Sequence, residues 1–326
     1  MTTLEAISPI DRSATTYIAG HRGLVGSAVW RRMQNDGFTN LIGRTSSELD
    51  LRNRPDVFEF FSRMKPSCVV LAAAKVGGIV ANNTYPVDFI SDNLQIQTNV
   101  LDAALHHRVQ RLIFLGSSCI YPKLATQPIC EDQLLKGPLE PTNDAYAISK
   151  IAGIIHVQSV RRQYGLPWIS AMPTNLYGPG DNFSPTLSHV IPSLIRRFDE
   201  AKREGLESVT NWGSGTPRRE FLHVDDLADA VLHLLDNYNE STHINVGTGH
   251  DETIKEVSAI VADAIGYEGS TNWDTDKPDG TLRKVLDISA LKATGWKPQI
   301  STRSGIASTV EWYREHLRNS AEEVRL

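Results

Sequence analysis

Tyr146 and Lys150 are the two residues whose types and spacing point most directly to chemistry. They stand four residues apart in the stretch DAYAISK, residues 144–150. Residues four apart on a helix share one face, so the phenol and the ammonium can point into the same cleft. A free tyrosine titrates near pH ~10, and a neighbouring cation favours its phenolate. The pair therefore predicts a proton donor and acceptor that works near neutral pH.

A glycine loop, GHRGLVG at residues 20–26, lies far upstream of this pair. It follows a short apolar segment, Thr16–Ala19, and opens a stretch of helical periodicity that ends near Gly37. In that context glycines let the backbone approach a pyrophosphate, whose negative charge the helix N-terminus favours. The loop predicts a dinucleotide site, although a lone glycine motif can also be a simple strand-to-helix turn.

Charge near the loop indicates which dinucleotide is bound. NAD sites place an acidic residue about 20 residues after the loop, where it bonds the ribose 2′-hydroxyl. Here the second predicted strand, Leu41–Ile42, runs into Arg44, and Arg22 lies inside the loop. Two guanidiniums near the ribose suit a 2′-phosphate, which favours NADP(H). Asp50 is an acidic residue that would favour NAD, but it lies several positions beyond the place where NAD sites carry this residue.

Strand and helix alternate through the first half of the chain. Further strands are expected at 68–71, 112–115 and 168–172, and long helices from about 92 to 107 and from 146 to about 164. This alternation predicts an α/β fold with a doubly wound parallel sheet.

Beyond residue 172 the alternation degrades into stretches rich in Pro, Gly, Asn and Ser. Two apolar segments, 221–224 and 243–247, are predicted to be strands that return to the main sheet. The predicted parts are a flexible tail (1–15), a dinucleotide-binding domain (16–172 plus 220–247) and a smaller substrate lobe (173–219 plus 248–326).

Composition restricts the class of protein. The chain has 326 residues, 40% apolar and 22% charged, with a net charge of −5 and no long basic run, so nucleic acid is not an expected partner. No apolar stretch approaches the roughly 20 residues of a membrane helix, and the first fifteen residues lack the apolar core of a signal peptide. Three cysteines without metal-ligand spacing predict no metal and a reduced, cytoplasmic enzyme.

The order glycine loop, Ser117, Tyr146, Lys150 resembles the extended short-chain dehydrogenase/reductase family. The resemblance covers residues 16 to about 315 and is carried by nine stretches: GHRGLVGSA, LAAAKVGGIVANNTYP, FLGSSCIYPK, EPTNDAYAISKIAG, PTNLYGPGDNF, SHVIPSLIRRF, TPRREFLHVDD, INVGTG and KPDGTLRK. These are similar to a member that uses NADPH to epimerise carbons 3 and 5, and to reduce the 4-ketone, of GDP-4-keto-6-deoxymannose. That activity, a GDP-sugar substrate and a homodimer are what the resemblance implies.

The resemblance also implies roles in the reduction. Tyr146 is the expected proton donor, Lys150 lowers its pKa and holds the nicotinamide ribose, and Ser117 bonds the ketone oxygen. Ser117 can alternatively be a strand-end serine that satisfies a turn. The expected cofactor contacts are Gly20, His21, Arg22, Gly23, Leu24, Val25, Gly26, Arg44, Asp50, Leu51, Ala72, Leu115, Gly116, Ser118, Lys150, Pro173, Thr174, Asn175, Leu176 and His189.

Epimerisation needs a base on one face of the sugar and an acid on the other. Cys119 and His189 are the candidates carried over from the family, and which is acid and which is base stays open. A thiol (pKa ~8.5) and an imidazole (~6.5) both titrate in the useful range. The alternatives are a buried apolar cysteine and a structural histidine.

A nucleotide diphosphate requires local cations in a protein of negative net charge. The expected substrate contacts are Arg197, Trp212, Arg219, Asp279 and Lys284. Asp279 can instead make a Pro-Asp-Gly turn. The neighbouring Arg196, Arg218 and Arg283 are expected to be solvated, although sequence does not separate the members of each pair.

Two other functions compete with this one. A 4-epimerase or 4,6-dehydratase of the family would retain NAD, but dehydratases carry an Asp-Glu pair where Ser118-Cys119 stands here. A non-catalytic NADP-binding protein would typically lose the Tyr or Lys, and both are present. The homodimer is expected to pack through the helices near 92–107 and 147–164.

Overall fold

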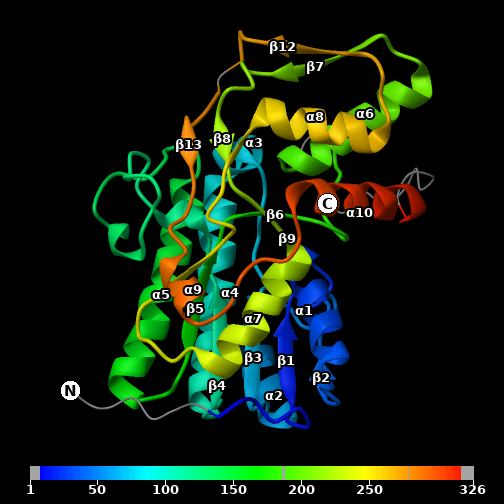
Figure 1. The fold of residues 1–326 in the computed structure, drawn as a ribbon. Coiled ribbons are helices and arrows are strands. Elements are labelled where there is room, and N and C mark those ends of the chain that lie inside the picture. The colour runs from blue at the N-terminus through cyan, green and yellow to red at the C-terminus, as the bar shows by residue number, and fades with distance from the viewer. Residues whose placement is uncertain (1–7, 186–187, 278, 317–326) are drawn as a thin grey trace.

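A six-stranded parallel sheet forms the centre of the molecule (Figure 1). The computed structural model describes residues 8–185, 188–277 and 279–316. The strand order β10-β5-β4-β3-β1-β2 reverses direction beside β1, as in a doubly wound fold, and confirms the predicted class. The strands are β1 (Thr16–Ala19), β2 (Leu41–Ile42), β3 (Cys68–Leu71), β4 (Arg111–Leu115), β5 (Ile169–Pro173) and β10 (Ile244–Val246).

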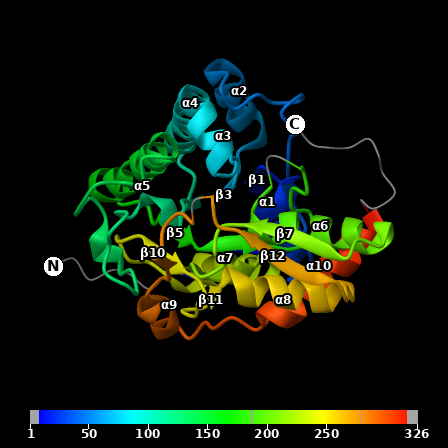
Figure 2. The ribbon, with the colours of Figure 1, turned by 90° about the horizontal axis from the view of Figure 1, so that it is seen from above.

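Helices cover both faces of this sheet (Figure 2). On one face α1 (Leu24–Asn35) packs against α7 (Val224–Asn237). On the other, α2 (Arg54–Met64), α4 (Pro86–His106) and α5 (Asp144–Tyr164) lie side by side. Because both faces are covered, the central strands are buried along their whole length, and apart from Thr16 in β1 and Arg111 in β4 their sequences are runs of mainly apolar residues.

Two element predictions need correction. The segment 221–224 does not return to the main sheet: β9 (Phe221–His223) pairs with β6 (Asn175–Tyr177) in a separate two-stranded sheet, while β10 does join the main one. Helix α4 begins at Pro86 rather than near residue 92, because proline fits the first turn of a helix and Asp88 favours its N-terminus.

The elements outside the main sheet and its covering helices form a second part of the molecule, which has its own hydrophobic core. It contains α6 (Val190–Glu204), α8 (Ile254–Ile265) and α10 (Thr302–His316), with the strand pair β7 (Ser208–Trp212) and β12 (Ser270–Asp274). A three-stranded sheet of β11 (Glu252–Thr253), β8 (Arg218–Arg219) and β13 (Arg283–Lys284) borders the first part. Two short helices, α3 (Ile79–Thr84) and α9 (Ser289–Ala293), complete the fold.

Part of the expected N-terminal tail is held on the dinucleotide-binding side. Residues 1–7 lie outside the described residues, but the Ile10 amide donates to Asp236, and Arg12 forms ion pairs with Asp36 and Asp236 at 2.6 and 2.7 Å. Arg12 also lies 4.8 Å from the centre of the Phe38 ring. Among the described residues, no helix is long and apolar enough to cross a membrane.

Candidate active site

One cleft of about 1730 Å³ opens at the carboxyl ends of the parallel strands and extends into the second part of the molecule. This is where open α/β sheets bind their ligands. All but two of the predicted site residues line it; His21 and Arg22 do not. The lining set is Gly20, Gly23, Leu24, Val25, Gly26, Arg44, Asp50, Leu51, Ala72, Leu115, Gly116, Ser117, Ser118, Cys119, Tyr146, Lys150, Pro173, Thr174, Asn175, Leu176, His189, Arg197, Trp212, Arg219, Asp279 and Lys284.

The glycine loop fits a pyrophosphate. A Cβ atom at Gly26 would lie 2.1 Å from the Gly20 carbonyl oxygen, so only glycine allows the turn into α1. Gly23 is the N-cap of α1 and brings no capping side chain, and the first turn has no acidic residue. The backbone N–H groups and the positive end of the helix dipole can therefore face an anion in the cleft.

His21 explains a second glycine and turns away from the cleft. Its ring lies where a Cβ atom of Gly43 would be, 2.3 Å from the nearest ring atom, and 5.6 Å from the Trp30 ring. His21 therefore packs against the end of strand β2, which is a structural role. Gly43 leaves room for this ring, but the connection between the two residues is visible only in the folded structure.

The two arginines predicted to select NADP lie near each other. Burial is the main cause of the lowered pKa of His21, and the charges of Arg22 and Arg44 lower it further. Hydrogen bonds from Thr45 are the main cause of the lowered pKa of Glu48, to which both arginines also contribute. The Arg44 guanidinium also lies 5.7 Å from the centre of the Phe60 ring. Glu48, which receives the Thr45 amide at 2.7 Å, was not predicted as part of this region.

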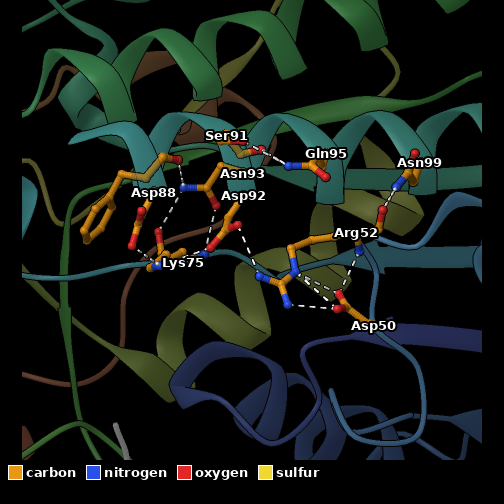
Figure 3. A network of polar contacts seen from close by, with 10 residues as sticks. Asp50, Arg52, Lys75, Asp88, Ser91, Asp92, Asn93, Gln95 and Asn99 are labelled. Carbon is orange, nitrogen blue, oxygen red and sulfur yellow. Dashed lines mark hydrogen bonds and ion pairs between the residues drawn. The ribbon is translucent and has the colours of Figure 1, made fainter. Parts of the chain in front are cut away.

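A polar network that the sequence did not predict ties two cleft-lining loops to α4 (Figure 3). Arg52 pairs with Asp50 at 2.8 Å and with Asp92 at 3.3 Å, and Lys75 pairs with Asp92 at 3.0 Å. Asn93 accepts from the Lys75 amide at 2.8 Å and donates to its carbonyl at 3.0 Å. The Asp50 carboxylate is thus committed to Arg52, on the same loop.

Ser117 and Cys119 belong to one tight turn after β4. The turn is the 3₁₀ segment Ser118–Ile120, and the Ser117 hydroxyl accepts from the Cys119 amide at 3.2 Å. Ser117 therefore accepts a hydrogen bond within the turn, which agrees with the alternative, structural interpretation of this serine. Its hydroxyl also interacts with the Tyr146 phenol. The two roles are compatible because a hydroxyl accepts and donates at once.

Tyr146 and Lys150 lie on the buried face of α5, and both reach the cleft. Burial, reinforced by the Cys119 thiol, raises the pKa of Tyr146, and the Ser117 hydroxyl opposes the shift. The net shift of the Tyr146 pKa is therefore upward, opposite to the lowering expected from Lys150, although the Lys150 ammonium lies 5.8 Å from the centre of the Tyr146 ring. Lys150 donates to the Leu115 carbonyl at 3.0 Å, and its burial lowers its own pKa to about 8.

The two candidate acid–base residues approach the cleft from different parts. Cys119 follows β4, and its sulfur lies 3.7 Å from the Lys284 ammonium, which donates to it. His189 is the N-cap residue of α6, where its side chain makes no capping hydrogen bond. The His189 residue as a whole is exposed, and desolvation around its imidazole lowers the pKa of this group.

At the far end of the cleft, the predicted substrate residues gather on the second part. Arg197 on α6 donates to the Thr210 carbonyl, and burial lowers the pKa of Arg219. The Trp212 side chain is 65% exposed, which leaves a face open for stacking. Asp279 accepts from the amide and hydroxyl of Ser214, both at 2.7 Å, so it holds the 213–216 turn as well as lining the cleft.

Ion pairing separates the basic pairs that the sequence left ambiguous. Arg196 pairs with Glu200 at 2.8 Å, and Arg218 and Arg283 both pair with Asp251. Three of the basic residues form no ion pair within 4 Å with a described carboxylate: Arg197, Arg219 and Lys284. In each pair of neighbouring basic residues, the one without such an ion pair is therefore the residue predicted to bind the substrate: Arg197, Arg219 or Lys284.

The doubly wound sheet, the glycine loop and the Ser-Tyr-Lys set in one cleft define a dinucleotide-binding α/β protein. The comparison with protein families is more specific. The model described as the NAD dependent epimerase/dehydratase family matches residues 16–247. The chain belongs to this family.

Several relatives match almost the whole chain. GDP-L-fucose synthase 1 of Arabidopsis thaliana is 57% identical, over 97% of this chain and 98% of the relative. GDP-L-fucose synthase of Escherichia coli (strain K12) is 53% identical, over 92% of this chain and 96% of the relative. Among solved structures, a GDP-L-fucose synthetase from Naegleria fowleri bound to NADP has a TM-score of 0.88 and 28% identity, covering 95% of this chain and 96% of that one.

Proposed function

We propose that this chain uses NADPH to epimerise carbons 3 and 5, and to reduce carbon 4, of GDP-4-keto-6-deoxy-D-mannose, which gives GDP-L-fucose. The observation that carries the proposal is the convergence of two residue sets in one cleft. Ser117, Tyr146 and Lys150 suit reduction, and Cys119 and His189 suit epimerisation. Relatives that carry the name GDP-L-fucose synthase match nearly the full chain.

The cofactor is NADP(H), which supplies the hydride for reduction when it is bound. Its pyrophosphate belongs at the N-terminus of α1, where the loop backbone is open to an anion. Arg44, which lines the cleft, would hold the 2′-phosphate, with Arg22 adding positive charge nearby from outside the lining, and the buried Lys150 ammonium would bond the nicotinamide ribose. The structure of the Naegleria relative contains NADP, in agreement with this choice.

In the reduction, Tyr146 gives its proton to the oxygen at carbon 4. Its raised pKa keeps the phenol protonated, which is the form that a donor needs. The Ser117 hydroxyl, which interacts with this phenol, bonds the same oxygen and orients the ketone. Lys150 is the nearby cation that stabilises the phenolate left behind.

In the epimerisation, the ketone acidifies the hydrogens at carbons 3 and 5. One of Cys119 and His189 removes a proton from one face, and the other returns a proton to the opposite face. Ser117 and Tyr146 stabilise the enolate oxygen between the two events. Arg197 and Arg219 hold the diphosphate, and Trp212 offers an exposed ring to the base.

The test is a direct assay of the purified protein with GDP-4-keto-6-deoxymannose. NADPH oxidation should accompany formation of GDP-L-fucose, identified by NMR, and solvent deuterium should appear at carbons 3 and 5. Reduction without deuterium at these carbons would identify a simple 4-reductase. Absence of any turnover, with NADPH still bound, would favour a non-catalytic NADP-binding protein.

A homodimer and a cytoplasmic location are also proposed. Ile148, Ala152 and Ile155 are exposed along one face of α5, and Val87 is 72% exposed on the adjoining α4. An apolar stripe of this spacing suits a helix–helix contact between two copies. The three cysteines are free thiols, and Cys130 is exposed, which suits a reducing compartment.

A further inference from the structure

We propose that Glu220 is a positioning residue that links the two ends of the cleft, so that NADP(H) and the GDP-sugar bind cooperatively. Glu220 lies between β8 and β9, directly after Arg219, a predicted substrate residue. Its side chain is fully buried, and Glu220 does not line the cleft itself. The inference rests on the proposed function, because it takes a GDP-sugar as the second ligand.

The backbone of Glu220 is bonded to both ends of the cleft. Its carbonyl accepts from the Asn175 side chain at 2.8 Å and from the Thr174 hydroxyl at 3.3 Å. Asn175 and Thr174 are predicted cofactor residues that line the cleft. The Glu220 amide donates to the Lys284 carbonyl at 3.2 Å, in the strand β13 that pairs with β8. One residue thus connects the cofactor loop to the strands that carry Arg219 and Lys284.

The carboxylate of Glu220 ties two further segments to the same place. One oxygen accepts from the Gly249 amide at 2.7 Å and from the Thr248 hydroxyl at 3.4 Å, and the other accepts from the Leu286 amide at 2.8 Å. Gly249 lies after β10 of the main sheet, and Leu286 lies after β13. A Cβ atom at Gly247 would overlap the carboxylate, so the end of β10 packs closely against it. All these partners donate, which suits a group that accepts at both oxygens.

This arrangement gives a physical reason for cooperative binding. Four segments that are distant in the sequence, after β5, β8, β10 and β13, share the hydrogen bonds of one buried residue. A buried polar group is costly to leave unpaired, so these segments keep their relative positions. A ligand that orders the cofactor loop therefore also orders the strands at the substrate end. The second ligand then binds to an arrangement that is already fixed, and the effect is equal in both directions.

The experiment measures this coupling in the full-length protein by isothermal titration calorimetry. The Kd of GDP is determined with and without saturating NADP⁺, and the Kd of NADP⁺ with and without GDP. GDP is used because it lacks the sugar that would meet the nicotinamide, so direct contact between the ligands does not contribute. In the wild type, each ligand should tighten the binding of the other about fivefold or more.

Glu220→Gln should remove most of this coupling. An amide has one acceptor oxygen, and its NH₂ group would face a backbone donor, so one of the two ends loses its bond. The coupling should fall to about twofold or less, while each ligand still binds alone. Asn175→Ala removes the 2.8 Å bond to the Glu220 carbonyl without changing the buried carboxylate, and it should reduce the coupling in the same way.

Asp226→Asn is the matched control. Asp226 on α7 is also a buried carboxylate, and it accepts from the Gln299 and Ile300 amides at 3.1 and 2.9 Å. It does not line the cleft. The substitution should lower the stability of the fold, as Glu220→Gln does, but it should leave the coupling at the wild-type value.

The outcomes separate this inference from the proposed function. Independent binding of GDP and NADP⁺ to the wild type overturns the coupling but not the proposed function. Wild-type coupling in folded Glu220→Gln or Asn175→Ala, checked by circular dichroism, also overturns it, as does an equal loss in Asp226→Asn. A wild type that binds no GDP contradicts both. Coupling that depends on Glu220 supports the inference even without turnover of GDP-4-keto-6-deoxymannose, in which case only the proposed function fails.

Discussion

Burial and the hydrogen bond from Ser117 shift the pKa of Tyr146 in opposite directions. Its ring is packed edge-on against Phe89 at 6.4 Å, and the surrounding protein favours the neutral phenol. The Ser117 hydroxyl favours the phenolate instead. Because burial dominates, Tyr146 stands ready to donate rather than to accept a proton, and reduction depends on it more than epimerisation does.

Removing the Tyr146 hydroxyl should separate the two activities. In Tyr146→Phe, NADPH oxidation should fall by roughly 10²–10⁴-fold, the usual contribution of a positioned acid. Solvent deuterium should still enter carbons 3 and 5, because Cys119, His189 and Ser117 remain. NMR of the sugar and NADPH absorbance measure the two activities in one sample. A variant that reduces the ketone at the normal rate would exclude Tyr146 as the donor.

Asp181 is a buried carboxyl that the proposed chemistry does not use. One of its oxygens accepts from the Asn182 amide at 2.7 Å, and the other is buried without a described hydrogen-bond partner. Burial raises the pKa of Asp181 to about 7. The folded state therefore binds this proton more tightly than the unfolded chain does, and Asp181 stabilises the fold only while it stays protonated.

The sign of this linkage gives a pH-dependent prediction. Stability from Asp181 should be fully present below about pH 4 and lost as the pH rises through about 7. Asp181→Asn imitates the protonated side chain, so the variant should gain on the wild type by at most about 4 kcal/mol over this window. Urea unfolding at several pH values gives the difference in free energy. A difference that stays constant with pH would show that Asp181 is ionised throughout.

At the scale of elements, α4 does more than cover the sheet. Its buried Asn93 binds both backbone groups of Lys75, and its Asn99 donates to the Leu51 and Arg52 carbonyls at 2.9 Å (Figure 3). These bonds fix the loops after β2 and β3, which line the cofactor end of the cleft. The helix therefore transmits its own position to the cofactor site.

Asn93→Ala should loosen this connection. The Lys75 amide and carbonyl would lose their partner, at a cost of about 1–3 kcal/mol in the free energy of unfolding. The KM for NADPH should rise more than kcat falls, because the catalytic side chains stand elsewhere. Gln95→Ala is the control, since among the described residues the side chain of this exposed glutamine on the same helix hydrogen-bonds only to Ser91. Equal effects of the two substitutions on unfolding and on KM would contradict the inference.

Local sequence predicted elements well where burial leaves a simple pattern. The runs 16–19 and 68–71 coincide with β1 and β3, because both faces of these strands are covered and every side chain is apolar or small. The helix α2 was not predicted, although Val57, Phe60 and Phe61 form its buried side. The partner of β9 could not be predicted, since pairing with β6 depends on how the second part folds back.

For the site, too, the sequence predicted residues that belong to local motifs but not contacts between distant segments. Motifs of adjacent residues brought the glycine loop, Ser117, Cys119, Tyr146 and Lys150 to one cleft as expected. Contacts across the sequence left no such signal. Lys284 reaches Cys119 from 165 positions away, and its sequence context suggested only a cation for phosphate.

For the whole molecule, charge is distributed unevenly. The chain carries a net charge of −5, yet cations without a described carboxylate partner gather where a diphosphate is expected. Carboxylates neutralise the neighbouring arginines Arg196, Arg218 and Arg283. Local positive potential inside a cleft can attract a dianion in spite of the net charge.

The exposed stripe on α5 leads to a prediction for the assembled molecule. Ile148 and Ile155 are 44% and 42% exposed, seven positions apart and on one face. Burying an isoleucine contributes about 1.5–3 kcal/mol, and a two-fold symmetric contact would bury both residues from each copy. The combined Ile148→Glu and Ile155→Glu variant should therefore change a dimer into a folded monomer, measured by light scattering after size exclusion. Leu124→Glu is the control, because Leu124 is 91% exposed but lies off both helices, so this variant should stay dimeric. A wild-type monomer, or a double variant that remains a dimer, would remove this face of α5 as the interface.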